Sequence, residues 1–151
     1  MRLAEHAKIG DYSKILGQDL TDFFSFTFVR NPYDWEVSHY NFIKTTPEHH
    51  QFKEVSPMEF EEYIEWRCSE HRVLQKSFVC DESGEQIVDF IGQFENLDND
   101  FSLVCSHLGI DKKLPHLNKH SHPAAQSLFS KRLAARYRTS FEEDFAFFGY
   151  S

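Results

Sequence analysis

The sequence predicts an α/β domain with a mainly parallel sheet flanked by helices. Segments of strand character, such as FFSFTFV at residues 23–29, alternate along the chain with segments that repeat apolar residues at helical spacing. Two parallel strands need a crossover connection between them, and a helix usually provides it. Strands that alternate with helices are therefore expected to pair in parallel. The chain has 151 residues, 40% of them hydrophobic, and no internal repeat or Gly/Ser linker. We therefore expect a single domain over residues 1–151.

The N-terminal part is expected to hold one strand between two helices. Residues 3–17 are predicted as a short helix that ends at Gly17. FFSFTFV is apolar on both faces, which is typical of a strand buried on both sides. Pro32 occupies a position that suits proline as a first helical residue, so a helix is predicted from there to about Ile43. The polar residues 44–55 are predicted as a loop.

A second helix is predicted after SPME at residues 56–59, a capping-box sequence with proline at the first helical position. Phe60, Ile64 and Cys68 follow at helical spacing, so this helix is expected to reach about His71. Strands are predicted at 77–80 and 86–94 around a turn at 81–85, followed by a helix at 96–108 that ends at Gly109. The stretch at 114–123 is predicted to be irregular. Helices are predicted at 127–138 and 140–147, the second opened by a capping box from Ser140 to Glu143.

The charge balance excludes a general nucleic-acid binder. Lys and Arg number 16 against 24 Asp and Glu, giving a net charge of −8, so the chain has no basic field to attract a polyanion. A small anionic ligand is not excluded, because it needs only a few local donors.

The cysteines and the hydropathy bear on the compartment. Cys68, Cys80 and Cys105 form no CxxC pair, which indicates free thiols in a reducing environment. No segment approaches the roughly 20 apolar residues that a membrane span needs, and the first residues do not resemble a signal peptide. The chain is expected to be cytoplasmic or an excised soluble domain, with no transmembrane segment.

An arginine stands where the first predicted strand meets its helix. In α/β folds ligands gather where strands end and helices begin, and Arg30 would stand at that edge of the sheet. A guanidinium holds a phosphate through two parallel charged hydrogen bonds, and Ser38, two helical turns later, could add a hydroxyl donor. The alternative is that Arg30 pairs with Asp34 and that Ser38 is an ordinary surface residue.

Five blocks of this sequence, in order, resemble the carbohydrate sulfotransferases of the Golgi-type and bacterial family. FVRNPYDWEVSHY resembles the family segment FVRNPYDRLVSAY, and IVDFIGQFENLDNDF resembles "vDfIGrfEnLeeDf". The other three are EHAKIGDYSKILG, LPHLNKHSH and DFAFFGY, which resemble "kHatarelr…lG", "LPhlN" and "DfelFgY". The blocks span nearly the whole chain, which makes the resemblance specific and leaves a general phosphate binder of unrelated chemistry as a weaker reading.

This resemblance implies a P-loop-NTPase-like sulfotransferase fold and a defined chemistry. The enzyme would transfer a sulfuryl group from PAPS (3′-phosphoadenosine 5′-phosphosulfate) to a hydroxyl of a carbohydrate acceptor. By the family's pattern, Arg30 and Ser38 would bind the 3′-phosphate of PAPS. Two positions depart from the pattern, because Trp35 and Gln93 stand where the family has arginines. Both departures remove positive charge near an anionic cofactor.

The family's other cofactor element, of the form "hiPKtaGTSl", does not occur in these residues. It holds the 5′-phosphosulfate, and preorganised groups of that kind are each worth about 2.7–4 kcal/mol of barrier. We expect an N-terminally truncated domain, the C-terminal greater part of the enzyme, with the loop supplied by a missing N-terminal segment or by a partner chain. The alternative is a catalytically inactive remnant that binds the adenosine 3′-phosphate half of the nucleotide or acts as an interaction module.

Two further residues are candidates for the site. His6 lies in the block that resembles "kHat" and is the candidate base for the acceptor hydroxyl, since histidine titrates near neutral pH; the alternative is a surface histidine. Lys119 in LPHLNKHSH is a candidate cofactor contact or an ordinary loop lysine. The histidines of that loop offer imidazoles to a metal, but its prolines oppose a helix and no cysteine or carboxylate joins them, so no metal site is expected.

Overall fold

The computed structural model describes residues 23–114 and 125–151. The predicted helix at 3–17 and nearly all of the irregular stretch at 114–123 lie outside the described residues. The chain forms two compact units, which we call the sheet unit (Met1–Val29 and Leu74–His116) and the helical unit (Arg30–Val73 and Leu117–Ser151). Each unit is described by itself.

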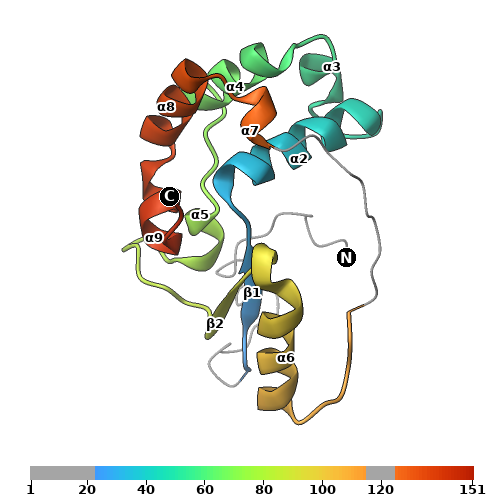
Figure 1. The fold of residues 1–151 in the computed structure, drawn as a ribbon, viewed down its shortest axis with the longest axis vertical. Coiled ribbons are helices and arrows are strands. Elements are labelled where there is room, and N and C mark those ends of the chain that lie inside the picture. The colour runs from blue at the N-terminus through green and yellow to red at the C-terminus, as the bar shows by residue number, and fades with distance from the viewer. Residues whose placement is uncertain (1–22, 115–124) are drawn as a thin grey trace. The chain divides into compact units, whose positions relative to one another are not determined.

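The sheet unit contains two parallel strands, β1 (Phe26–Val29) and β2 (Phe90–Gln93). Figure 1 shows the two strands side by side. Phe26 pairs with Phe90, and the register continues to Val29 with Gln93. The predicted α/β class with parallel strand pairing is confirmed. β1 is shorter than the predicted strand at 23–29, and the exposed fractions of Phe23 and Phe26 are 54% and 41%. The expectation of a strand buried on both faces is therefore wrong for these two residues.

A reciprocal contact sets the start of both strands. The carboxylate of Asp89 accepts hydrogen bonds from the backbone N–H of Ser25 (2.7 Å) and from its hydroxyl (2.8 Å). The Ser25 hydroxyl in turn accepts from the backbone N–H of Asp89 at 3.1 Å. These bonds from the backbone and the hydroxyl of Ser25 lower the pKa of Asp89 below its usual value. Ser25 and Asp89 therefore fix the register of the two strands one residue before their first paired residues.

Helix α6 (Leu97–Leu108) follows β2 through the short 3-10 helix η2 (Phe94–Asn96) and packs against that strand. Gly92 allows the Phe28 ring and α6 to lie close to β2, because glycine has no side chain. A Cβ at this position would lie 2.5 Å from the Phe28 ring and 3.1 Å from Cβ of Asp100. The carboxylate of Asp100 accepts from the backbone N–H of Gln93 at 2.7 Å, which joins strand to helix. The helix ends at Gly109 in the left-handed conformation, as predicted.

The predicted strand at 77–80 is wrong. Lys76–Val79 forms the short helix α5, and strand pairing is limited to an isolated antiparallel bridge between Cys80 and Gln86. A four-residue apolar run carries no periodicity that distinguishes a helical turn from a strand. The predicted turn is present, because the carboxylate of Asp81 accepts from the backbone N–H groups of Ser83 and Glu85. The predicted strand at 86–94 is shortened to β2.

The described part of the helical unit consists of helices (Figure 1). Their bounds are α2 (Pro32–Thr45), α3 (Phe52–Val55), α4 (Phe60–Ser69), α7 (Ala125–Leu128), α8 (Lys131–Ser140) and α9 (Glu142–Phe148). The predicted helix at 32–43 is confirmed and runs two residues further. The prediction of a loop throughout 44–55 is wrong at its end, where α3 forms.

Two predicted capping boxes are misplaced. The helix at Phe60 is opened by Glu59, whose backbone N–H donates to the Glu62 carboxylate at 2.8 Å, one turn after the predicted Ser56. Ser140 ends α8 instead of opening α9. The predicted helix at 127–138 is divided between α7 and α8, because Ser130 accepts from the backbone N–H of Leu133 and so starts α8.

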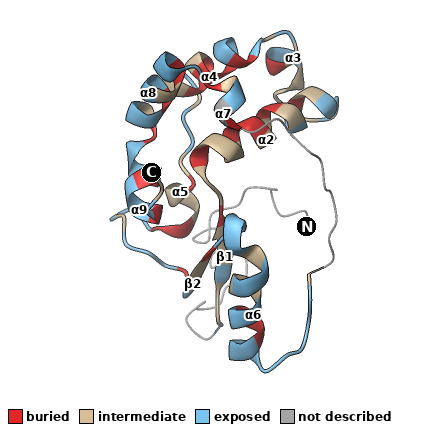
Figure 2. Cartoon of the chain, viewed as in Figure 1, coloured by how far each residue is buried: buried red, intermediate tan, exposed pale blue. Residues whose placement is uncertain are grey.

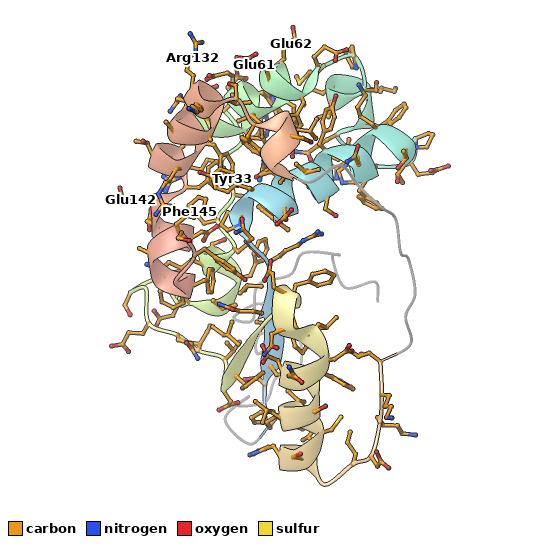
Figure 3. All side chains as sticks on the ribbon, viewed as in Figure 1. Tyr33, Glu61, Glu62, Arg132, Glu142 and Phe145 are labelled. Carbon is orange, nitrogen blue, oxygen red and sulfur yellow. The ribbon has the colours of Figure 1, made fainter. Side chains whose placement is uncertain are left out.

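Aromatic side chains form much of the core of the helical unit. Tyr33 of α2 lies against Phe145 of α9, with ring centroids 5.0 Å apart (Figure 3). The fully buried Tyr137 stacks on Phe141 with centroids 4.3 Å apart and donates its hydroxyl to the carbonyl of Pro32 at 3.1 Å. Tertiary contacts between rings therefore join the start of α2 to α8 and α9.

None of the helices in the two described ranges is long and apolar enough to span a membrane.

Candidate functional site

The junction after β1 is a short, well-capped turn into α2. Asn31 is the N-cap, and its side-chain oxygen accepts from the backbone N–H of Tyr33 at 3.0 Å. Pro32 is the first helical residue, where its missing N–H costs nothing. Arg30 is half-buried and directly precedes this cap. The sequence RNP therefore ends the strand and starts the helix within three residues.

The backbone at the start of α2 provides fewer N–H donors for an anion than we expected from the sequence. Pro32 has no N–H to donate, and the N–H of Tyr33 already bonds to Asn31. Asp34 also lies in the first turn, where a carboxylate offsets the positive end of the helix dipole. An anion at this junction would depend on side chains, with Arg30 as the cation adjacent to the cap.

Ser38 lies on the face of α2 opposite the one packed inside the helical unit. Figure 2 shows that buried and half-buried segments alternate along α2. The buried residues follow helical spacing around one side of the helix and are Pro32, Glu36, Val37, Tyr40 and Ile43. At 100° per residue, Ser38 is centred on the other side, next to Asp34, and its exposure is intermediate. The orientation of α2 thus keeps the Ser38 hydroxyl out of the helical core.

A buried ion pair sets that orientation. Glu36 is completely buried, and its carboxylate accepts from Nη2 of Arg67 at 2.9 Å and from Nε at 3.1 Å. The exposed fraction of the Arg67 side chain is only 2%. Burial alone would lower the pKa of Arg67, but attraction by Glu36 outweighs it, so the pKa is raised and the guanidinium stays charged. Because both charges are desolvated, rotation of α2 away from α4 would leave each unpaired.

Tyr63 and His39 extend the ion pair into a directed chain of hydrogen bonds. The Tyr63 hydroxyl donates to Glu36 at 2.7 Å, because a carboxylate can only accept. Burial, together with the charge of Glu36, raises the pKa of Tyr63 far above its ordinary value, so the hydroxyl keeps its proton. The 3.0 Å contact between the Tyr63 hydroxyl and Nδ1 of His39 then requires that Nδ1 donate. His39 thus carries a proton on Nδ1.

Arg67 has two further contacts that complete this cluster. Its Nη1 donates to the carbonyl of His71 at 2.6 Å, and its guanidinium lies over the ring of Trp35, 5.6 Å from the centroid. Trp35 stands where the resemblance would place an arginine. A second cation at that position would face Arg67, so the tryptophan suits this buried cluster.

Two of the four predicted site residues are described, and both belong to the helical unit. Arg30 precedes α2 and Ser38 lies within it. His6 and Lys119 lie outside the described residues, so their roles stay predictions, as do those of Arg30 and Ser38. Sequence reasoning missed Glu36 and the residues that bind it. The available signal was a charged residue within an apolar helical stripe, which occurs at Glu36 and again on α4 at Arg67.

The chain matches the model of a known protein family. Residues 3–151 match the model of the sulfotransferase family. This chain belongs to the sulfotransferase family. No curated protein and no solved structure gives a significant match.

Membership of the sulfotransferase family accounts for the order of the sequence blocks. The matched range includes the segment around Arg30, the β2–α6 segment and the C-terminal helices. A sulfotransferase moves a sulfuryl group from a donor to an acceptor, so the family implies both of these ligands. The described α/β arrangement, with its parallel strand pair, agrees with a sulfotransferase fold.

Proposed function

We propose that this sulfotransferase uses PAPS as the donor and a carbohydrate hydroxyl as the acceptor. The 3′-phosphate of PAPS would bind to the guanidinium of Arg30 and the hydroxyl of Ser38. The observation that carries the proposal is the position of these two residues relative to α2. One directly precedes the helix cap, and the other lies on the face turned away from the helical core.

The surrounding contacts support this assignment. Arg67 is committed to Glu36, and the amide oxygen of Asn31 is committed to the cap of α2. Arg30 directly precedes that cap, and its guanidinium is the cation that we assign to the phosphate. A phosphate bound by a guanidinium and a hydroxyl receives charge-assisted bonds, each stronger than a neutral one.

The proposed reaction is an in-line displacement at sulfur. The acceptor hydroxyl loses its proton to a base, for which His6 is the candidate, and its oxygen bonds to sulfur. The bond from sulfur to the bridging phosphate oxygen breaks, and adenosine 3′,5′-bisphosphate leaves with the electron pair. As in phosphoryl transfer, positioning and charge stabilisation supply most of the catalysis. Lys119 would contact the cofactor.

Calorimetric titration with adenosine 3′,5′-bisphosphate tests the donor site. We expect saturable binding by the wild type and about 10- to 100-fold weaker binding by Arg30→Ala, the usual value of hydrogen bonds from a charged group. Ser38→Ala should weaken binding about 2- to 10-fold, as for a neutral hydrogen bond. Arg72→Ala is the matched control, because it removes the same charge from an exposed pair with Glu143 in the same unit.

Adenosine 5′-monophosphate provides a second control, since it lacks the 3′-phosphate. If it binds as tightly as the bisphosphate, or if Arg72→Ala weakens binding as much as Arg30→Ala, the assignment of the 3′-phosphate to Arg30 is wrong. Transfer is then measured as the mass gain of a saccharide incubated with PAPS. Nucleotide binding without transfer would favour the alternative of an inactive nucleotide-binding module.

A further inference from the structure

The hydroxyl of Ser38 differs from hydroxyls elsewhere in the described helices. In α2 itself, the Thr45 hydroxyl donates to the carbonyl of Asn41 at 2.8 Å. Ser102 and Ser106 of α6 likewise donate to the carbonyl four residues earlier, at 2.8 and 2.9 Å. For the Ser38 hydroxyl, the described residues provide no such bond. This hydroxyl is therefore available to a ligand, and its position depends on how α2 is rotated about its axis.

A buried carboxylate fixes the rotation of α2 more tightly than the apolar residues of the helix can. Apolar packing has no preferred direction, so Val37 and Ile43 would stay buried over a range of rotation angles. Glu36 would not, because three donor atoms hold its carboxylate. They are Nε and Nη2 of Arg67, at 3.1 and 2.9 Å, and the hydroxyl of Tyr63, at 2.7 Å.

The main partner of this carboxylate is itself held in place. Nη1 of Arg67 donates to the carbonyl of His71 at 2.6 Å, so the guanidinium cannot follow Glu36 if α2 turns. On the same side of α2, Tyr40 supports this rotation through one bond, to a backbone carbonyl just before α4 at 2.9 Å. The carboxylate of Glu36 therefore has one position relative to α4. The position of Ser38, two residues later on the same helix, is set with it.

Stability alone does not explain why this contact is an ion pair. Removing two charges from water costs free energy that their attraction only partly offsets, and apolar residues of similar volume are often at least as stabilising. An ion pair between a guanidinium and a carboxylate has a defined geometry, which an apolar contact lacks. The pair of Glu36 and Arg67 thus provides orientation that a pair of apolar side chains would not.

We infer that Glu36 is a positioning residue of the donor site. Arg67 and Tyr63 hold its carboxylate, and through α2 this contact determines where the Ser38 hydroxyl meets the 3′-phosphate of the donor. The inference rests on the proposed function, because it concerns the same phosphate, and it adds buried residues that touch no ligand. Since Glu36 acts through Ser38, its removal can weaken donor binding no more than the loss of the Ser38 hydroxyl does.

Calorimetric titration of the full chain with adenosine 3′,5′-bisphosphate tests the inference. Glu36→Gln/Arg67→Met removes both charges together, so α2 loses its directional contact while no unpaired charge stays buried. We expect this variant to bind the nucleotide about 2- to 10-fold more weakly than the wild type, within the value of one hydrogen bond from Ser38. Tyr63→Phe keeps the ion pair and removes one of the donors, so its loss should be smaller.

A double-mutant cycle with Ser38→Ala separates positioning from a general effect on the fold. If Glu36 acts through Ser38, Glu36→Gln/Arg67→Met should change binding by less than about twofold when Ser38 is already alanine. Two losses that multiply would overturn the inference, because loosening of the fold weakens binding whether or not the hydroxyl is present. If the variant without both charges does not fold, Tyr63→Phe enters the same cycle, and multiplied losses there have the same meaning.

Leu133→Ala is the matched control, since it leaves a cavity at a buried residue of α8 in the same unit. It should keep nucleotide binding within about twofold of the wild type, and a loss equal to that of Glu36→Gln/Arg67→Met would overturn the inference.

The same titrations distinguish this inference from the proposed function. If Arg30→Ala and Ser38→Ala weaken binding as expected but Glu36→Gln/Arg67→Met binds like the wild type, only the positioning role is wrong. A wild type that binds no nucleotide would reject the donor site and the positioning role together.

Discussion

The two units place their charged groups differently. In the described residues of the helical unit, Glu36, Arg67 and Asp144 are buried, and the first two form an ion pair. In the described sheet unit, Asp81 and Asp89 are exposed and bind backbone N–H groups of turns and strand ends. The helical unit therefore depends on desolvated charges that must stay paired. The sheet unit depends on backbone geometry and close approach, as at Gly92.

The largest expected effect is at the buried ion pair. Glu36→Gln leaves the Arg67 guanidinium buried without its counter-charge and should lower the free energy of unfolding by about 3–5 kcal/mol. The double variant Glu36→Gln/Arg67→Met should recover much of that loss, because it removes both charges. The measurement is urea unfolding followed by circular dichroism.

The exposed pair of Arg72 and Glu143, at 2.6 Å, provides the control. Arg72→Ala should change the free energy of unfolding by no more than about 1 kcal/mol, the range for surface ion pairs. A double variant as unstable as Glu36→Gln alone would show that the buried charges are not the reason for the loss.

The sheet unit should be most sensitive at Gly92. The Cβ of Gly92→Ala would meet the Phe28 ring and Asp100, so β2, β1 and α6 must separate slightly. We expect a loss of about 1–3 kcal/mol, typical of overpacking. Hydrogen exchange should show the loss in the amides of β1, β2 and α6.

Gly109→Ala at the end of α6 is a useful contrast, because no atom lies within 4 Å of its Cβ position and its cost comes from backbone conformation. A similar pattern of exchange in both variants would argue against the packing explanation.

A smaller effect is expected at Tyr137 in the helical unit. Tyr137→Phe keeps the stacked ring but removes the buried hydroxyl that donates to Pro32. The loss should be about 0.5–1.5 kcal/mol, the net value of one hydrogen bond. Thermal unfolding measures it. An unchanged unfolding temperature in Tyr137→Phe would mean that the bond to Pro32 adds nothing to the start of α2.

The smallest and most pH-dependent effect is expected at Asp89. Its folded pKa is lowered, so its contribution to stability is present above the pKa of the unfolded chain, about 4, and is lost as the pH falls through the lower folded value. Asp89→Asn should be less stable than the wild type near neutral pH, and the difference should narrow under acid conditions. Urea unfolding between pH 7 and pH 2 checks this. A difference that widens in acid would contradict the assigned hydrogen bonds.

The sequence alone predicted the α/β class and the main helices, because these depend on local patterns. Pro32 after Asn31 marks a helix start, and Gly109 supplies the positive φ that ends α6. The resemblance that placed Arg30 and Ser38 in a sulfotransferase also needs only the order of residues. Short segments were predicted less well. The predicted strand at 77–80 overlaps the helical turn Lys76–Val79, since four residues carry too little periodicity to distinguish a strand from a helical turn.

Only the tertiary structure decided which side chains meet. Glu36 and Arg67 are separated by 31 positions, and nothing local to either residue specifies the other as its partner. Their pairing orients α2, and through Tyr63 it makes Nδ1 of His39 a hydrogen-bond donor. The ring contacts of His49 with His39 and Phe42 likewise form only because the loop after α2 returns to that helix. Periodicity assigns a residue to a face of its own helix, whereas packing of distant segments determines what that face contacts.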